Sequence, residues 1–109
     1  MRQDVKELAD AMEAGWKLCP HMVSHSFFTS KDNSNQTPEA PTACCPRGHA
    51  GLGKYGSADK HTLFPVLFSQ RVQFPSYSID CLAYAINELA DKGWTTPQVV
   101  AWLRSHLND

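Results

Sequence analysis

The sequence predicts a mainly helical domain, in which an N-terminal helix packs on a C-terminal αα-hairpin and an irregular middle rich in glycine and proline connects them. Three observations lead to this prediction. Apolar residues recur at helical spacing near the N-terminus, the same spacing returns after residue 78, and most glycines and prolines fall between. A length of 109 residues with 42% hydrophobic content suits a single small globular domain, 1–109.

The first predicted helix runs from Asp4 to about Leu18. Asp4 and Glu7 have the spacing of a capping box, in which side chains satisfy free backbone donors. Pro20 ends the helix, because it removes a donor and restricts the residue before it. The apolar positions on one stripe of this helix are Val5, Leu8, Ala9, Met12 and Trp16.

The middle of the chain is expected to be irregular. Residues Met22–Phe28 form a short strand or an extended loop, and a polar surface loop follows at about 29–42. Pro46 can open a short helix, which the glycines between Gly48 and Gly56 weaken or break. Residues Asp59–Phe68 hold another short helix or an extended apolar segment.

Two further helices are predicted at the C-terminal end. Ser78 caps a helix that runs to Lys92, and Gly93 suits the left-handed position that ends it. Thr96 caps the next helix, with Pro97 in its first turn. So short a connection makes the two helices an αα-hairpin. Their apolar stripes comprise Ile79, Leu82, Ala83, Ile86, Leu89 and Ala90, then Val99, Val100, Leu103 and Leu107.

Two short clusters combine cysteine with histidine, the residue types that bind zinc. They suggest a tetrahedral structural site, although their spacing differs from that of common zinc modules. Free cysteines are also among the most buried residues, so packing alone explains them equally well. The expectation is therefore no cofactor, with zinc as the alternative. The candidate ligands are Cys19, His21, Cys44, Cys45 and His49.

The charge distribution marks the middle third as a candidate surface for a protein partner. The net charge is −1, which argues against sequence-independent binding of nucleic acid. Residues 44–78 nevertheless carry four basic side chains and one acidic side chain. Arginine and aromatic residues dominate protein interfaces, although this segment can equally belong to the core. The candidate partner-binding residues are Arg47, Lys54, Tyr55, Lys60, His61 and Arg71, and the same surface includes Phe64 and Phe68.

Enzymatic readings of the middle segment have weak support, and no catalytic residue is predicted. Residues Gly48–Tyr55 nearly match a phosphate-binding P-loop, but Tyr55 stands where Ser or Thr would bind Mg²⁺. A cysteine nucleophile with a histidine base would pair Cys45 with His49, or Cys19 with His21. Either pair needs a third, orienting group that the sequence does not identify.

A helix-turn-helix DNA-binding protein is another alternative. Residues Leu89–Leu103 resemble its first two helices, with the spacing Leu-x-x-x-Gly and then Val-Ala-x-Leu. A recognition helix must present side chains to base edges in the major groove. In the last predicted helix only Gln98 and Arg104 suit that task.

The order of the elements resembles a small bacterial and phage domain family of unknown activity. The shared features are a first amphipathic helix, a cysteine-containing helix start followed by Gly and Ala, and a final Trp-Thr helix. They correspond to Val5–Trp16, Ala43–Gly51 and Trp94–Leu103. The resemblance implies a compact, largely helical accessory protein of bacterial or phage origin.

Together these observations predict a small, non-enzymatic interaction protein that binds a host protein, with inhibition of that protein as one option. No apolar run reaches transmembrane length, and the N-terminus has no apolar stretch typical of a signal peptide. The expected location is therefore the cytoplasm, without a membrane partner. The sequence predicts no oligomeric state.

Overall fold

Helices make up most of the chain, which confirms the predicted fold class. The computed structural model describes residues 2–31 and 36–107. The longer helices are α1 (Gln3–Leu18), α2 (Pro46–Tyr55), α4 (Leu82–Asp91) and α5 (Thr96–His106). Two shorter ones, the 3₁₀ helix η1 (Ala58–Leu63) and α3 (Val66–Ser69), connect α2 with α4.

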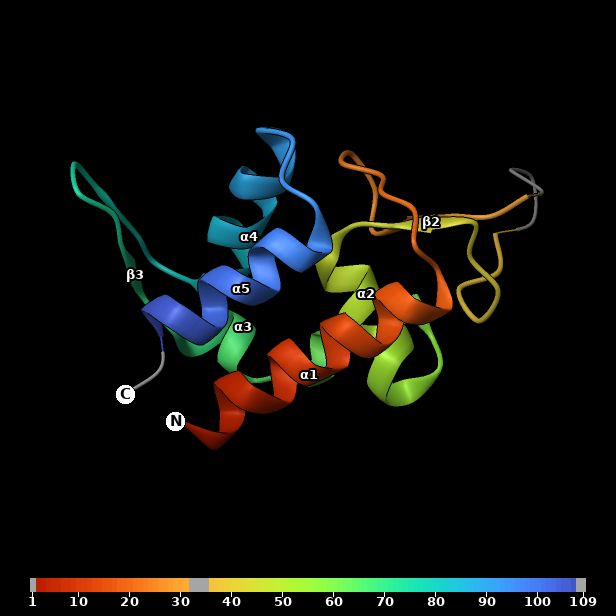
Figure 1. Ribbon diagram of the computed structural model, residues 1–109, viewed down its shortest axis with the longest axis horizontal. Helices are drawn as coiled ribbons and strands as arrows, with labels where there is room; N and C mark the ends of the chain where they lie inside the picture. Colours follow the sequence, from red (N-terminus) through yellow and green to blue (C-terminus); the bar gives the residue numbers. More distant parts are fainter. Residues whose placement is uncertain (1, 32–35, 108–109) are drawn as a thin grey trace.

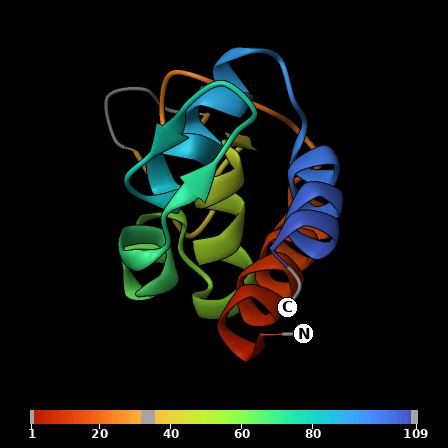
Figure 2. The ribbon, with the colours of Figure 1, turned by 90° about the vertical axis from the view of Figure 1, so that its left-hand side faces the viewer.

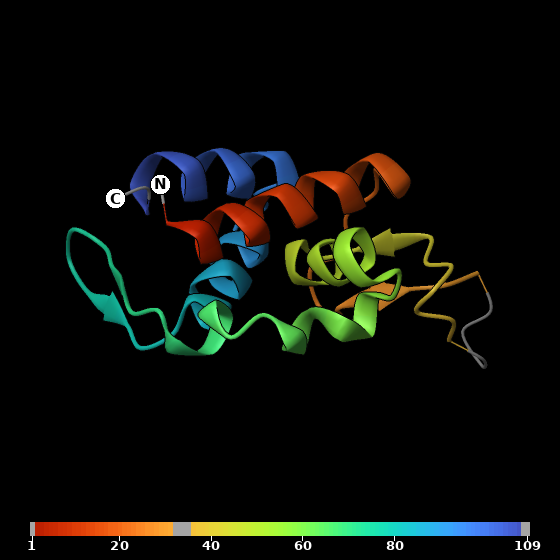
Figure 3. The same ribbon diagram turned by 90° about the horizontal axis from the view of Figure 1, so that it is seen from below.

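The helices form two layers. α1 and α5 lie side by side in one layer, and α2, α3 and α4 pack beneath them (Figures 2 and 3). The most extensive helix contact joins α1 to α2, ahead of the contact between α1 and α5. α2, which the sequence places in the irregular middle, is therefore a main structural element.

Two glycines make the contact between α1 and α2 possible. A Cβ atom added at Gly15 of α1 would lie 1.8 Å from the carbonyl oxygen of His49 in α2. A Cβ atom added at Gly53 of α2 would lie 1.9 Å from the carbonyl oxygen of Ala11. The prediction that glycines weaken or break this helix is therefore wrong for Pro46–Tyr55, because they let its backbone reach that of α1. Gly56, at a φ of 74°, ends the helix in the left-handed conformation.

The helix starts differ from the predicted ones by a few residues. Arg2 is the N-cap of α1 and makes no side-chain cap, so the predicted capping box of Asp4 is absent. Ser78 lies in a strand, and α4 begins after Cys81. Thr95 rather than Thr96 caps α5, and it forms a capping box with Gln98.

Two short antiparallel strand pairs lie at opposite ends of the molecule (Figure 1). β1 (Phe28–Thr29) pairs with β2 (Ala43–Cys44) and closes the loop between them. Residues 32–35 of the predicted polar loop lie outside the described residues. β3 (Val72–Gln73) pairs with β4 (Ser78–Ile79) in a hairpin that projects from the far end.

The described residues contain a large apolar core and a small second cluster. The large core lies between the two layers and includes Leu8, Met12, Leu67, Leu82, Ile86, Val99 and Leu103. The second cluster consists of Cys19, Cys44, Leu52 and Ala58, with Phe28 packed against it. It lies where the end of α1, β2 and α2 meet, and this is where the predicted metal ligands gather.

Candidate functional site

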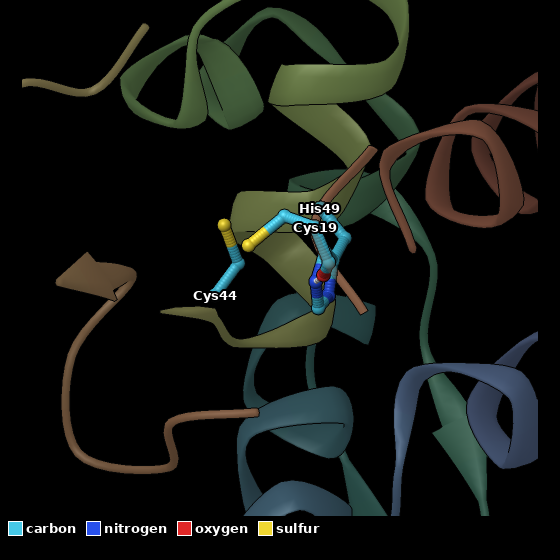
Figure 4. A group of neighbouring side chains, drawn as sticks. All are labelled: Cys19, Cys44 and His49. Atoms are coloured by element: carbon cyan, nitrogen blue, oxygen red, sulfur yellow. Dashed lines mark hydrogen bonds between the residues drawn. The ribbon is translucent and has the colours of Figure 1, made fainter. Parts of the chain in front are cut away.

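Three of the five predicted metal ligands come together at the second cluster, to which two of them belong. Cys19 directly follows α1, Cys44 belongs to β2, and His49 lies in α2. All three are buried, and one ligand atom from each lies within 4.8 Å of the others. The two sulfur atoms point toward each other, and the imidazole ring lies to one side of them (Figure 4). This group could hold a metal ion.

The other two predicted ligands lie apart from this group. The His21 side chain is exposed, and only its backbone contributes here: its N–H donates to the Cys19 carbonyl oxygen at 2.8 Å, and its carbonyl oxygen accepts from the Cys44 N–H at 3.1 Å. The Cys45 thiol caps α2 and accepts a hydrogen bond from the Gly48 N–H at 3.4 Å. Adjacent residues in an extended chain point to opposite sides, so Cys44 and Cys45 face different surroundings.

Both ring nitrogens of His49 already have hydrogen-bond partners. Nε2 lies 2.7 Å from the Cys19 carbonyl oxygen, which can only accept, so Nε2 donates. Nδ1 therefore accepts from the Thr96 hydroxyl at 2.6 Å. Burial lowers the pKa of His49, which keeps the ring neutral. His49 is a satisfied core histidine, and it must give up one of these partners to bind a metal.

The two cysteine side chains of the group differ in their interactions. The Cys19 thiol donates to the Pro41 carbonyl oxygen at 3.6 Å. Burial raises the pKa of Cys44, and the neighbouring Cys19 raises it further. Zinc binds thiolates, so an incoming metal would displace a proton from each sulfur. The group offers three ligands, whereas closed structural zinc sites use four.

The six predicted partner-binding residues occupy different surroundings. Lys54, Lys60 and Arg71 are exposed, and Tyr55 is half-buried. Lys54 pairs with Glu7 at 3.5 Å. Arg71 donates to the Ser78 hydroxyl at 3.0 Å. The remaining two, Arg47 and His61, are buried and contact each other.

Arg47 has unusual surroundings for a charged side chain. Its Nη2 donates to Nδ1 of His61 at 3.3 Å, and its buried Nε has no hydrogen-bond partner. The guanidinium carbon lies 4.8 Å from the centre of the Phe27 ring and 5.6 Å from that of Phe68. The Tyr84 hydroxyl is close enough to influence its charge. We call these five residues the Arg47 surface.

Two aromatic members of this surface were not predicted as site residues. Phe27 is 41% exposed and Tyr84 is 66% exposed. Tyr84 lies off the apolar stripe of its helix, so an aromatic side chain on the solvent face was a signal available in the sequence. Phe27 precedes β1 in a segment without periodicity, and only the fold brings it to Arg47.

The surroundings of Cys45 bear on the weakly supported alternative of a cysteine nucleophile, and a hollow lies beside this residue. The hollow has a volume of about 320 Å³, and its lining includes Cys45, His25 and Asp91. Nδ1 of His25 lies 3.9 Å from a carboxylate oxygen of Asp91. Burial raises the pKa of the Cys45 thiol, which opposes formation of the nucleophilic thiolate. The arrangement does not activate this cysteine.

The two candidate DNA-reading side chains are engaged within the protein. The Gln98 side chain accepts from the Thr95 N–H at 2.7 Å. Arg104 pairs with Asp10 and Glu13, at 2.9 Å each, and so connects α5 to α1. To contact DNA bases, the side chains of Gln98 and Arg104 would have to give up these contacts within the protein.

No protein-family model, curated protein or solved structure matches this chain. Among the described helices, none has both the length and the apolar character needed to cross a bilayer. The site geometry is therefore the basis for a functional proposal.

Proposed function

We propose that this protein is a non-enzymatic binding module that recognises a partner protein through the Arg47 surface. The observation that supports it most strongly is the aromatic rim around Arg47. Phe27, Phe68 and Tyr84 are each more than 40% exposed; the first two rings contact one buried guanidinium, and Tyr84 contributes to its electrostatic surroundings. Aromatic residues and arginine are the types that supply most of the binding energy at protein interfaces.

The way the surface is assembled also favours binding. Its members come from the segment before β1 and from α2, η1, α3 and α4, so packed elements hold them in place. A preformed site loses little conformational entropy when a partner docks. Burial of three aromatic side chains can contribute several kcal/mol, since each full burial is worth roughly 1.5–3 kcal/mol.

Partner capture from a bacterial lysate, suggested by the family resemblance of the sequence, tests this proposal. The bait is the full chain, and the test variant is Phe68→Ala combined with Tyr84→Ala. Leu18→Ala is the matched control, because Leu18 is 69% exposed and lies at the end of α1. We expect a protein retained by the wild type and by the control but lost with the double variant. Retention by all three baits would refute the proposed surface.

A structural zinc site is the second candidate function. It is supported by the three buried ligand residues Cys19, Cys44 and His49, whose ligand atoms lie within 4.8 Å of one another. Zinc would require the loss of two thiol protons and of one hydrogen bond of His49. A fourth ligand would have to be a water molecule or a group that moves toward the site.

Metal analysis of the purified, untagged protein separates this candidate from simple packing. One equivalent of zinc that is lost in Cys44→Ser but kept in Cys45→Ser would support the site. A strong chelator should then also lower the melting temperature. Metal-free protein with an unchanged melt in chelator would identify the cysteines as packing residues.

A further inference from the structure

Arg47 carries a charge that the described part of the chain leaves largely unsatisfied. Its side chain is 6% exposed, so water reaches little of it. A guanidinium has five N–H donors, and the structure gives one hydrogen bond, to His61. The buried Nε has no partner. Buried polar groups normally find hydrogen-bond partners, and a buried ion normally finds a counter-ion.

No counter-ion for Arg47 is found among residues 2–31 and 36–107. Every ion pair given by this part of the chain joins side chains other than that of Arg47. The groups that influence the charge of Arg47 are Cys45, Cys81 and Tyr84, none of which is a carboxylate. The Cys45 thiol is neutral, because burial raises its pKa. Within this part of the chain, the Arg47 cation therefore has no anion.

The surroundings of the Arg47 guanidinium favour a carboxylate as its ligand. Phe27 and Phe68 lie within cation–π distance of its carbon atom and exclude water from it. Nε and a neighbouring Nη form the fork that accepts both oxygens of a carboxylate. No lysine or second arginine influences the charge of Arg47. A single cation matches a monoanion better than it matches a phosphate dianion.

We infer that Arg47 binds an aspartate or glutamate side chain of the partner protein, with Phe27 and Phe68 contacting the apolar part of that residue. This inference rests on the proposed function and adds the chemical identity of the group that is recognised. Because Nε is buried, neighbouring side chains must move aside for this contact; the two hydrogen bonds then satisfy Nε and supply the missing counter-ion. Charge-assisted hydrogen bonds are roughly twice as strong as neutral ones.

Acetate serves as the probe, because it reproduces the carboxylate without the rest of the partner. The readout is the N–H signal of each arginine Nε in ¹⁵N-labelled full-length protein, with sodium chloride added to keep the ionic strength constant. Arg47→Lys assigns the Arg47 signal by its disappearance. We expect acetate to shift this signal along a saturating curve, about tenfold more than it shifts the signal of exposed Arg71.

Inorganic phosphate is titrated in parallel to test the choice of anion. Equal, linear shifts of Arg47 and Arg71 in acetate would overturn the inference, and so would stronger binding of phosphate than of acetate. The binding readout is made on the wild-type protein, and Arg47→Lys serves only to assign the signal. Phe68→Ala provides a second measure, since loss of one ring should weaken acetate binding severalfold.

The two proposals can fail separately. If acetate leaves Arg47 unchanged but capture still depends on Phe68 and Tyr84, the surface binds through apolar contacts and only this inference is wrong. If acetate binds Arg47 but capture ignores those aromatic residues, the carboxylate site stands and the proposed partner surface is wrong.

Discussion

Acidification should destabilise this protein through His61. The ring is buried beside Arg47, and its Nδ1 accepts a hydrogen bond from the guanidinium. Burial, assisted by the Arg47 charge, lowers the pKa of His61 from 6.5 to about 4. Between these two values the unfolded chain binds a proton that the folded protein does not. The stabilising contribution of neutral His61 is therefore complete above pH 6.5 and is lost as the pH falls toward 4.

The size of the loss follows from the two pKa values. Each pKa unit corresponds to about 1.4 kcal/mol of differential protonation. From pH 7 to pH 4.5, linkage with pKa values of 6.5 and about 4 gives a loss of about 2 kcal/mol in the free energy of unfolding. A small domain has a total stability of about 5–15 kcal/mol, so a loss of this size is readily measured.

Urea denaturation at the two pH values, for the wild type and for His61→Gln, isolates this effect. Glutamine keeps an acceptor for Arg47 but does not titrate. His49 and the carboxylates that form ion pairs titrate in both proteins, so their contributions cancel in the comparison. We expect the wild type to lose about 2 kcal/mol more than the variant. Equal losses in the two proteins would refute the assignment of a low pKa to His61.

Three further predictions concern the fold, all measured by urea denaturation. Gly53→Ala should lower the free energy of unfolding by about 3 kcal/mol or more, because the new methyl group meets the backbone of α1. Gly56→Ala should lower it by about 1 kcal/mol, because the new methyl group has nothing within 4 Å and only the positive φ is unfavourable. Similar losses of stability in the two variants would contradict the close contact between α1 and α2. Thr95→Ala should cost about 1 kcal/mol by removing the α5 capping box, and an unchanged midpoint would contradict it. Leu103→Ala in the core should cost about 2–5 kcal/mol, but exposed Leu63→Ala less than 0.5 kcal/mol.

The sequence predicts the helices with clear apolar stripes and loses accuracy where tertiary contacts decide. The stripes of α1, α4 and α5 are visible without a structure, since their spacing depends only on the helical period. α2 was undervalued, because propensity treats glycine as destabilising. In this fold Gly53 permits a contact between backbones, and no local pattern reports that contact.

The candidate sites show the same limit. Residue type was enough to select Cys19, Cys44 and His49, which the fold brings together. Residue type could not distinguish these three from His21 and Cys45, whose side chains lie outside the group. Which side of an extended segment a residue faces depends on the pairing of β1 with β2, and these strands are too short to show alternation.

The surroundings of Arg47 were not visible in the sequence, because its neighbours come from distant segments. The sequence predicts Arg47 as a partner-binding residue in a segment that can equally belong to the core, and the fold buries it between Phe27 and Phe68. A single charged residue among cysteine, proline, glycine and alanine gives no indication that it lacks a counter-ion. That property follows only from the arrangement of all the neighbouring segments.

The close approach of α1 and α2 also bears on how relatives of this protein are to be recognised. Cysteines in the core can be exchanged for other small residues, so they are poor markers of descent. Gly15 and Gly53 face carbonyl oxygens of the opposite helix at distances that no side chain tolerates. During divergence these two positions should remain glycine while the surrounding surface changes. A pair of glycines in two helices, separated by a polar insertion of variable length, is therefore the pattern with which to search for distant homologues.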